Sequence, residues 1–257
     1  MSKARLRLDA WLVKQGIASD AVHAKTLIEQ GLILVNGSIA LTDNRMIANS
    51  DSVLLSTPAR FVSRGGEKLE AALLSFNVAL TSKRVLDVGA STGGFTDCVL
   101  QRGAAEVVSL DVGKSQLHDR LVRDPRVKVL DSTNARTMTV DMVGDFDVVV
   151  ADLSFISLRQ VATALCEVLR PHGDMILLVK PQFEAEKSEV DKGAGVIRDV
   201  EIHQRTIDQV VQAFGSKGMT QSGIIESPLR GADGNTEFLL HLRWESVSGA
   251  HSVSRVE

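Results

Sequence analysis

The sequence predicts an α/β fold in which helices cover a seven-stranded, mainly parallel sheet, with a small α+β unit before it. Apolar segments typical of buried strands alternate with amphipathic segments of helical period from residue 84 to residue 242. A glycine-rich turn, residues 89–94, separates the first of these strands from the first of these helices. Residues 6–56 carry a different pattern, two short helices and a hairpin. Because helices usually connect parallel strands, the alternation predicts a parallel sheet.

The large unit has a definite order of elements. Its strands are predicted at residues 84–88, 106–110, 127–130, 147–151, 175–179, 222–226 and 237–242. Its helices are predicted near residues 94–102, 114–122, 156–169 and 199–217, after one that begins at Arg64-Gly65-Gly66. Ligands of such sheets bind beyond the carboxyl ends of the strands, so polar residues at those ends are candidate site residues.

The N-terminal unit is predicted to begin with an amphipathic helix from Leu6 to about Gly16. Ser19 or Asp20 caps a second helix, and Asn36-Gly37 is a strong hairpin signal. Strands are predicted on both sides of that turn, at residues 32–35 and 39–41, with another at 53–55. We therefore divide the chain into a first domain (1–58), a linker (59–63), an α/β domain (64–243) and a flexible tail (244–257).

Composition limits the classes of function. The 257 residues are 44% hydrophobic and 24% charged, with a net charge of −3, which provides a core but no generally basic surface. Residues 1–60 hold seven basic and five acidic residues, so the positive bias is local. No apolar run approaches the about 18 residues of a membrane span, and we expect a cytoplasmic protein without a membrane segment. Cys98 and Cys166 lie in apolar helical patterns, which predicts buried free thiols and no metal site.

Polar residues gather at the predicted strand ends. Asp87-x-Gly89-x-Ser91-x-Gly93 closes the first strand, and its glycine spacing differs from the dinucleotide pattern G-x-G-x-x-G. Asp111 ends the second strand, where a carboxylate suits the two hydroxyls of a ribose, although a helix N-cap is the alternative. Asp152 and Lys180 end two later strands.

The turn D-V-G-A-S-T-G-G-F-T with these strand-end residues resembles the FtsJ/RrmJ-like class of S-adenosylmethionine methyltransferases, which implies a Rossmann-like domain. Residues 6–56 resemble the S4 RNA-binding domain through Gly16-Ile17-Ala18, Gly31 and Val35-Asn36-Gly37. Together with R-G-G-x-K-L, T-N-A-R, A-D-L-S-F-I-S-L, V-K-P-Q-F-E and S-P-L-x-G-x-x-G-N-x-E, they resemble the TlyA family over residues 5–243. That family comprises ribosomal-RNA ribose 2′-O-methyltransferases and also carries the historical name haemolysin.

The resemblance implies site residues. The implied catalytic tetrad is Lys68, Asp152, Lys180 and Glu237. The implied contacts of the cofactor, S-adenosyl-L-methionine, are Gly89, Ala90, Ser91, Thr92, Gly93, Gly94, Phe95, Asp111, Asn134 and Asp152. Ser154 and Phe155 shape the methyl-donor or base pocket, or Phe155 is a core residue.

The tetrad suits methyl transfer to a ribose hydroxyl, which is a weak nucleophile and needs a base or a strong orienting field. Lys180 follows an apolar strand, and burial there favours a neutral amine, whereas Asp152 and Glu237 favour the ammonium ion. Both roles for Lys180, general base and oxyanion stabiliser, therefore stay open.

The S4 resemblance implies that a basic helix face meets RNA phosphates. The candidate RNA-binding residues are Lys3, Arg5, Arg7, Lys14, His23, Lys25 and, before the third helix, Arg64. The pattern departs from the family at Asp20-Ala21, where Ser-Arg is usual. Residues 182–198 form a polar connection that is either a binding loop or disordered.

The resemblance implies an S-adenosylmethionine-dependent methyltransferase of cytidine ribose in ribosomal RNA (16S, 23S or both), with ribosomal subunits as partners. The alternatives are a membrane-active haemolysin and a noncatalytic RNA-binding protein of the same fold. The target nucleotide, the subunit and the oligomeric state are not specified by the sequence.

Overall fold

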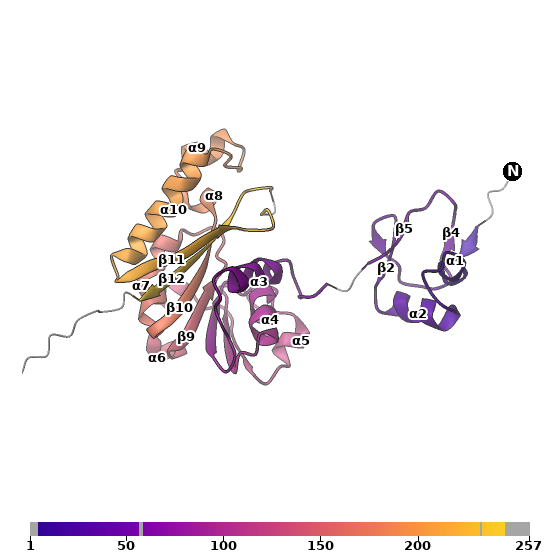
Figure 1. Cartoon of the computed structure of the whole chain (residues 1–257), viewed down its shortest axis with the longest axis horizontal. Coiled ribbons are helices and arrows are strands. Elements are labelled where there is room, and N and C mark those ends of the chain that lie inside the picture. The colour runs from indigo at the N-terminus through magenta and orange to yellow at the C-terminus, as the bar shows by residue number, and fades with distance from the viewer. Residues whose placement is uncertain (1–4, 57–58, 232, 245–257) are drawn as a thin grey trace, which may run out of the picture. The chain divides into compact units, whose positions relative to one another are not determined.

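The structure is a computed structural model that describes residues 5–56, 59–231 and 233–244. The candidate Lys3 and the tail from residue 245 lie outside these ranges. The chain divides into two compact units, Met1–Arg60 and Phe61–Glu257, which are both drawn in Figure 1. None of the helices in the described ranges has the length and apolar character that a membrane crossing requires.

The N-terminal unit has two helices and five short strands: β1 (Leu6–Arg7), α1 (Leu8–Lys14), α2 (Ala21–Glu29), β2 (Ile33–Val35), β3 (Ser38–Ile39), β4 (Met46–Ile47) and β5 (Val53–Leu55). Asp20 caps α2 by accepting a hydrogen bond from the His23 N–H at 2.8 Å. Asn36 and Gly37 both have positive φ, which is the conformation of a type I′ hairpin turn. Leu6 was predicted in the first helix but pairs in β1 with Ile47 of β4, and that strand was missed because it has only two residues.

The large unit contains the seven-stranded sheet that the sequence predicts, in the order β11-β12-β10-β9-β6-β7-β8. Its strands are β6 (Arg84–Val88), β7 (Glu106–Leu110), β8 (Val127–Leu130), β9 (Phe146–Ala151), β10 (Leu169–Val179), β11 (Met219–Glu226) and β12 (Phe238–Trp244). Five strands, β10 to β8 in that order, are parallel, and β12 runs antiparallel to both of its neighbours. The sheet is therefore mainly parallel, as predicted.

Helices cover both faces of this sheet. The elements are α3 (Gly65–Ser75), α4 (Gly94–Gln101), α5 (Asp119–Val122), η1 (Ala135–Thr137), α6 (Val140–Val143), η2 (Leu158–Gln160), α7 (Ala162–Glu167), α8 (Pro181–Glu184), α9 (Lys187–Lys192) and α10 (Val200–Gly215). Alternate strand residues point to opposite faces. Val148 and Val150 of β9 pack in the core with α3 and α4, whereas Val149 and Ala151 pack in the core with α7 and α10. Cys98 and Cys166 are buried, one in each core, and neither forms a disulfide within the described part of the chain, as predicted.

Several predicted segments differ from the structure. In the helix predicted near 114–122, only Asp119–Val122 is helical, because Ser115 has positive φ and its N–H donates to Asp131 at 2.8 Å. The helix predicted near 156–169 divides into η2 and α7. The connection 182–198 is not structureless, since it contains α8 and α9. In the expected linker 59–63, Phe61 is buried against Gly66 and belongs to the second core.

The strand order fixes where a ligand can bind. From β6 the chain continues through β7 and β8 on one side and then returns to β9 on the other side. The carboxyl ends of β6 and β9 therefore flank the point at which the strand order reverses, where open α/β sheets form their ligand crevice.

Candidate active site

The turn after β6 lies at this crevice. Gly89 has φ +82°, and a Cβ there would stand 2.5 Å from the carbonyl oxygen of Asp152, so only glycine allows the two strand ends to approach. Gly93 begins α4 in a left-handed conformation and packs against Leu117 and Leu121. These close contacts at Gly89 and Gly93 keep the turn compact. Open space remains on the side of the turn that faces away from the sheet.

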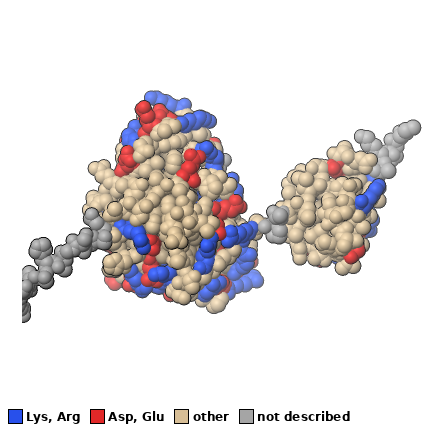
Figure 2. All heavy atoms as spheres, in the orientation of Figure 1, with Lys and Arg blue, Asp and Glu red and all other residues tan. Residues whose placement is uncertain are grey.

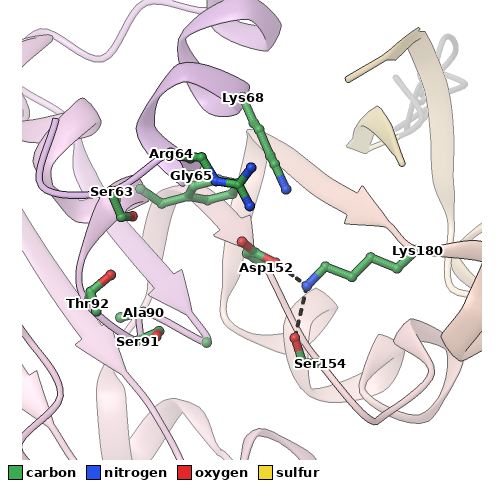
Figure 3. A pocket seen from close by; sticks show the side chains of 13 residues that line it. Ser63, Arg64, Gly65, Lys68, Ala90, Ser91, Thr92, Asp152, Ser154 and Lys180 are labelled. Atoms are coloured by element: carbon green, nitrogen blue, oxygen red, sulfur yellow. Dashed lines mark hydrogen bonds and ion pairs between the residues drawn. The ribbon is translucent and has the colours of Figure 1, made fainter. Parts of the chain in front are cut away.

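Two adjoining cavities of about 260 and 530 Å³ occupy that space and share Gly89, Ser91, Asp152 and Ser154. The smaller cavity, drawn in Figure 3, has thirteen lining residues: Ser63, Arg64, Gly65, Lys68, Gly89, Ala90, Ser91, Thr92, Gly94, Phe95, Asp152, Ser154 and Lys180. The larger cavity extends over the ends of β7 and β8, and Leu110, Asp111, Val112, Asn134, Ala135 and Ile156 are among its lining residues. One elongated ligand could therefore extend from polar to more apolar surroundings.

Asp111 lines the larger cavity and forms a hydrogen bond with the glycine-rich turn. Its carboxylate accepts the N–H of Ser91 at 2.8 Å and the N–H of Gly113 at 2.7 Å. It does not cap α5, whose N-cap is His118. Each carboxylate oxygen keeps a lone pair, so Asp111 can also accept ribose hydroxyls.

Four charged side chains form two close pairs beside the smaller cavity. Lys180 follows β10, and its Nζ lies 2.6 Å from Asp152 Oδ1 and 2.9 Å from Ser154 Oγ (Figure 3). Lys68 projects from α3, and its Nζ donates to Glu237 Oε2 at 2.5 Å. The Lys68 and Glu237 side chains are only 9% and 3% exposed, so this pair is largely withdrawn from water.

The loops that carry these residues are built for close packing. Gly94 approaches Ser63 and the Gly65-Gly66 turn so closely that a Cβ would overlap the Ser63 hydroxyl, and this contact seats the start of α3 on α4. Gly231 lies against the Glu237 carboxylate, where a Cβ would stand 2.6 Å from Oε1. The R-G-G-x-K and G-x-x-G-N-x-E motifs therefore place Lys68 and Glu237 in reach of each other.

Asp87 is a buried carboxyl directly beneath the turn. Its Oδ2 accepts the Thr96 hydroxyl at 2.6 Å, and Oδ1 has no hydrogen-bond partner among the described residues. Burial raises its pKa to about 7, and the nearby carboxylates of Asp152 and Asp111 act in the same direction. The sequence motif identifies Asp87 only as part of the turn, because its isolation from water is a property of the packed sheet.

Two aromatic rings, Phe155 and Phe183, contact each other on the segments that follow β9 and β10. Phe155 has φ +64° and is 92% exposed, and its ring centroid is 5.2 Å from that of Phe183. Lys180 Nζ is 5.7 Å from the centroid of Phe183. Phe155 is thus not a core residue, and its strained backbone holds an apolar ring in solvent at the edge of the larger cavity.

Most of the site residues that the sequence predicts come together. Gly93 and Glu237 line neither cavity, although Glu237 contacts Lys68. Arg64 lines the smaller cavity. Gln116 and Arg136 of the larger cavity were not predicted as site residues, although Arg136 is the last residue of the T-N-A-R motif.

The predicted RNA-binding residues of the N-terminal unit that lie in the described ranges are exposed, and in Figure 2 the basic side chains of this unit lie along one edge of an otherwise mostly uncharged face. Arg5, Lys14 and Lys25 are exposed, and Lys25 lies 3.7 Å from Glu29. Arg7 donates to both oxygens of Asp9, at 3.1 and 2.7 Å. His23 Nδ1 accepts the Ser19 N–H at 3.1 Å, so its ring supports the start of α2.

Comparison with known proteins matches both units. Residues 61–244 match the FtsJ-like methyltransferase family, and residues 6–48 match the S4 domain. The 16S/23S rRNA (cytidine-2′-O)-methyltransferase TlyA of Mycobacterium tuberculosis is 42% identical over 245 residues, which are 94% of this chain and 91% of that protein. The chain belongs to the TlyA family. The resemblance that the sequence motifs indicated is confirmed.

Two of the solved structures that resemble this chain carry the haemolysin name. One from Streptococcus thermophilus is 36% identical, with a TM-score of 0.71, and covers 95% of this chain and 90% of its own. One from Lactococcus lactis is 44% identical, with a TM-score of 0.69, and covers 71% of this chain and 88% of its own. The FtsJ-like domain makes this TlyA-family member a methyltransferase by fold, and the S4 domain precedes it.

Proposed function

We propose that this TlyA-family protein transfers a methyl group from S-adenosyl-L-methionine to the 2′-oxygen of a cytidine ribose in ribosomal RNA. The observation that carries the proposal is the pair of lysine–carboxylate contacts, Lys180–Asp152 and Lys68–Glu237, at the cavity formed by the glycine turn. The Mycobacterium tuberculosis relative supports the choice of cytidine and ribosomal RNA. Such a substrate would place the enzyme with ribosomes in the cytoplasm.

The two cavities fit the proposed cofactor. Asp111 is placed to accept the ribose hydroxyls, and the more apolar lining, including Leu110 and Ile156, suits an adenine ring. Within the described part of the chain, Oδ1 of buried Asp87 lacks a donor, which favours a cationic ligand nearby. When bound, S-adenosyl-L-methionine supplies an electrophilic methyl group on a positively charged sulfur.

Lys180 is the proposed contact of the attacking 2′-oxygen. As an ammonium ion it has three N–H groups, of which one donates to Ser154 Oγ, while the ion pair with Asp152 fixes the position of the charge. A further N–H can reach a 2′-oxygen in the smaller cavity and stabilise the alkoxide that develops as the hydroxyl loses its proton. Lys68, held by Glu237, adds positive charge to the same cavity.

The pH dependence of cofactor binding provides one prediction. A cationic ligand favours the ionised form of Asp87, whose pKa of about 7 in the unliganded fold leaves it mostly protonated at pH 6. We therefore expect the affinity for S-adenosyl-L-methionine to rise about tenfold between pH 6 and pH 8. Binding releases one proton from Asp87, and the loss of one proton changes an affinity by at most about tenfold for each pH unit below the pKa. Isothermal titration calorimetry measures this rise, and Asp87→Asn serves as the control that removes it. An affinity that stays flat from pH 6 to pH 8 in the unmodified protein would contradict the assignment.

Phe155 provides another prediction. An exposed aromatic ring at the edge of the larger cavity suits stacking with the base of the target nucleotide, and such stacking contributes about 1–3 kcal/mol per base. We expect Phe155→Ala to raise the KM for RNA about tenfold and Phe155→Trp to keep it near the original value. Because the Phe155 side chain lies at the edge of the larger cavity and is 92% exposed, the affinity for S-adenosyl-L-methionine should change less than twofold. Equal losses in RNA and cofactor binding would assign Phe155 to the cofactor pocket instead.

The function itself is tested with purified protein, tritium-labelled S-adenosyl-L-methionine and separate small and large ribosomal subunits. We expect the label in ribosomal RNA of at least one subunit. Leakage of erythrocytes at the same protein concentration, without methyl transfer, would favour the membrane-active alternative. RNA binding without label would favour the noncatalytic alternative.

A further inference from the structure

A buried acid links the two loops that carry Asp152 and Lys180. Glu184, the last residue of α8, is 3% exposed and lines neither cavity. Its Oε2 accepts the Ser157 hydroxyl at 2.5 Å, and its Oε1 accepts the Leu158 N–H at 2.7 Å. Arg159 Nε lies 3.2 Å from Oε2, and Arg159 Nη2 donates to the Glu184 carbonyl oxygen at 2.9 Å.

This acid is the innermost of three links between the segments 152–158 and 180–184. The first is Lys180 with Asp152 and Ser154, and the second is the ring contact of Phe183 with Phe155. Glu184 with the start of η2 is the third. The links follow one another along both segments, so moving one loop relative to the other would disturb all three.

Phe155 needs such a support. A non-glycine residue with φ +64° costs on the order of 1–3 kcal/mol, and it persists only where its surroundings fix it. The exposed ring contact with Phe183 is weak, because water surrounds Phe155. The hydrogen bonds of Glu184 lie two and three residues beyond Phe155 and are buried, so they can fix the backbone where the ring cannot.

We propose that Glu184 is the positioning residue that holds Phe155 in its strained, exposed conformation and thereby sets the position of the target base. The proposal rests on the proposed function for its effect on RNA. Glu184 lines neither cavity, and it acts through Ser157 and Leu158. Removing its carboxylate leaves the Ser157 hydroxyl and the Leu158 N–H without their acceptor, whereas the Arg159 guanidinium keeps its bonds to the Glu184 carbonyl oxygen and to Ser157 Oγ.

The test is a double-mutant cycle in the full-length protein, with kcat, the KM for RNA and the cofactor affinity as readouts. We expect Glu184→Ala to raise the KM for RNA about tenfold, with cofactor affinity changed less than twofold, and Glu184→Gln to recover part of the loss through its amide oxygen. If Glu184 acts through Phe155, Glu184→Ala adds less than twofold in the Phe155→Ala background. The proposal would be overturned if the increases in the KM for RNA caused by the two single changes multiply in the double variant. An unchanged KM for RNA in a folded Glu184→Ala protein would also overturn it.

A second readout does not depend on activity. With 4-fluorophenylalanine at position 155, we expect one fluorine resonance in the original protein and a shift towards the free amino acid value in Glu184→Ala. Asp174→Asn is the matched control, since Asp174 lies on β10 and accepts from His241 at 2.8 Å, six residues before Lys180. An unshifted resonance in Glu184→Ala would overturn the positioning role. If the original protein methylates no RNA while the resonance shifts as expected, the proposed function fails and the positioning role stands.

Discussion

Lys180→Ala is expected to lower kcat for RNA methylation about 10³-fold, the range for losing a donor that stabilises developing negative charge. The amine contacts both Asp152 and Ser154 in the cavity, and alanine replaces it with empty space. The affinity for S-adenosyl-L-methionine should change less than threefold, because the glycine turn and Asp111 remain. Single-turnover methyl transfer with saturating cofactor measures this effect.

A lysine outside the site is the control for this variant. Lys217 is exposed just beyond the end of α10, and Lys217→Ala should keep full activity. Methyl transfer by Lys180→Ala within about threefold of the original rate, in a protein with an unchanged melting curve, would remove Lys180 from the mechanism.

The Lys68–Glu237 pair is expected to contribute both to the stability of the fold and to methyl transfer. Removing one partner of a buried ion pair typically destabilises a fold by about 3–5 kcal/mol, because the other charge stays buried without compensation. We therefore expect Glu237→Leu and Lys68→Met each to unfold at lower urea concentration. The double variant Lys68→Met/Glu237→Leu should recover most of the stability and none of the activity, since the cavity has lost a positive charge.

An exposed pair in the same unit provides the comparison. Arg123 and Asp119 lie 3.6 Å apart at the surface, and their double-mutant cycle should show no measurable coupling. The unfolding of the FtsJ-like unit is followed separately by hydrogen exchange, because two units need not unfold together. Recovery of methyl transfer in the double variant would show that the pair has a structural role only.

Strand positions and strand-end residues were predictable because they depend on short, local patterns of apolar and polar residues. Residues 175–179 are apolar without interruption, and Asp87 is the one polar residue among residues 85–88. Such runs are typical of buried parallel strands, and the polar residues that follow them lie at one edge of the sheet. Asp111, Asp152 and Lys180 were found in this way. The roles of Lys68 and Glu237 came only from the family resemblance, because 169 residues separate them in sequence.

The remaining features depend on tertiary contacts. Residues 114–118 have a helical pattern, yet the bond from Ser115 N–H to Asp131 and the packing of Leu117 on Gly93 hold them in another conformation. The strain at Phe155 and the burial of Asp87 likewise arise from the assembled sheet. Glu184 ends the V-K-P-Q-F-E motif, but its burial has no local signal, since a glutamate at the end of a short helix is ordinarily exposed.

The central claim is that the cavity between the strand ends methylates a ribose of ribosomal RNA. Its most direct test maps 2′-O-methyl groups in ribosomal RNA from subunits incubated with S-adenosyl-L-methionine and either the original protein or Lys180→Ala. We predict at least one new 2′-O-methylcytidine with the original protein and none with Lys180→Ala. A methyl group on a base, or the same ribose methylation with both proteins, would contradict the account.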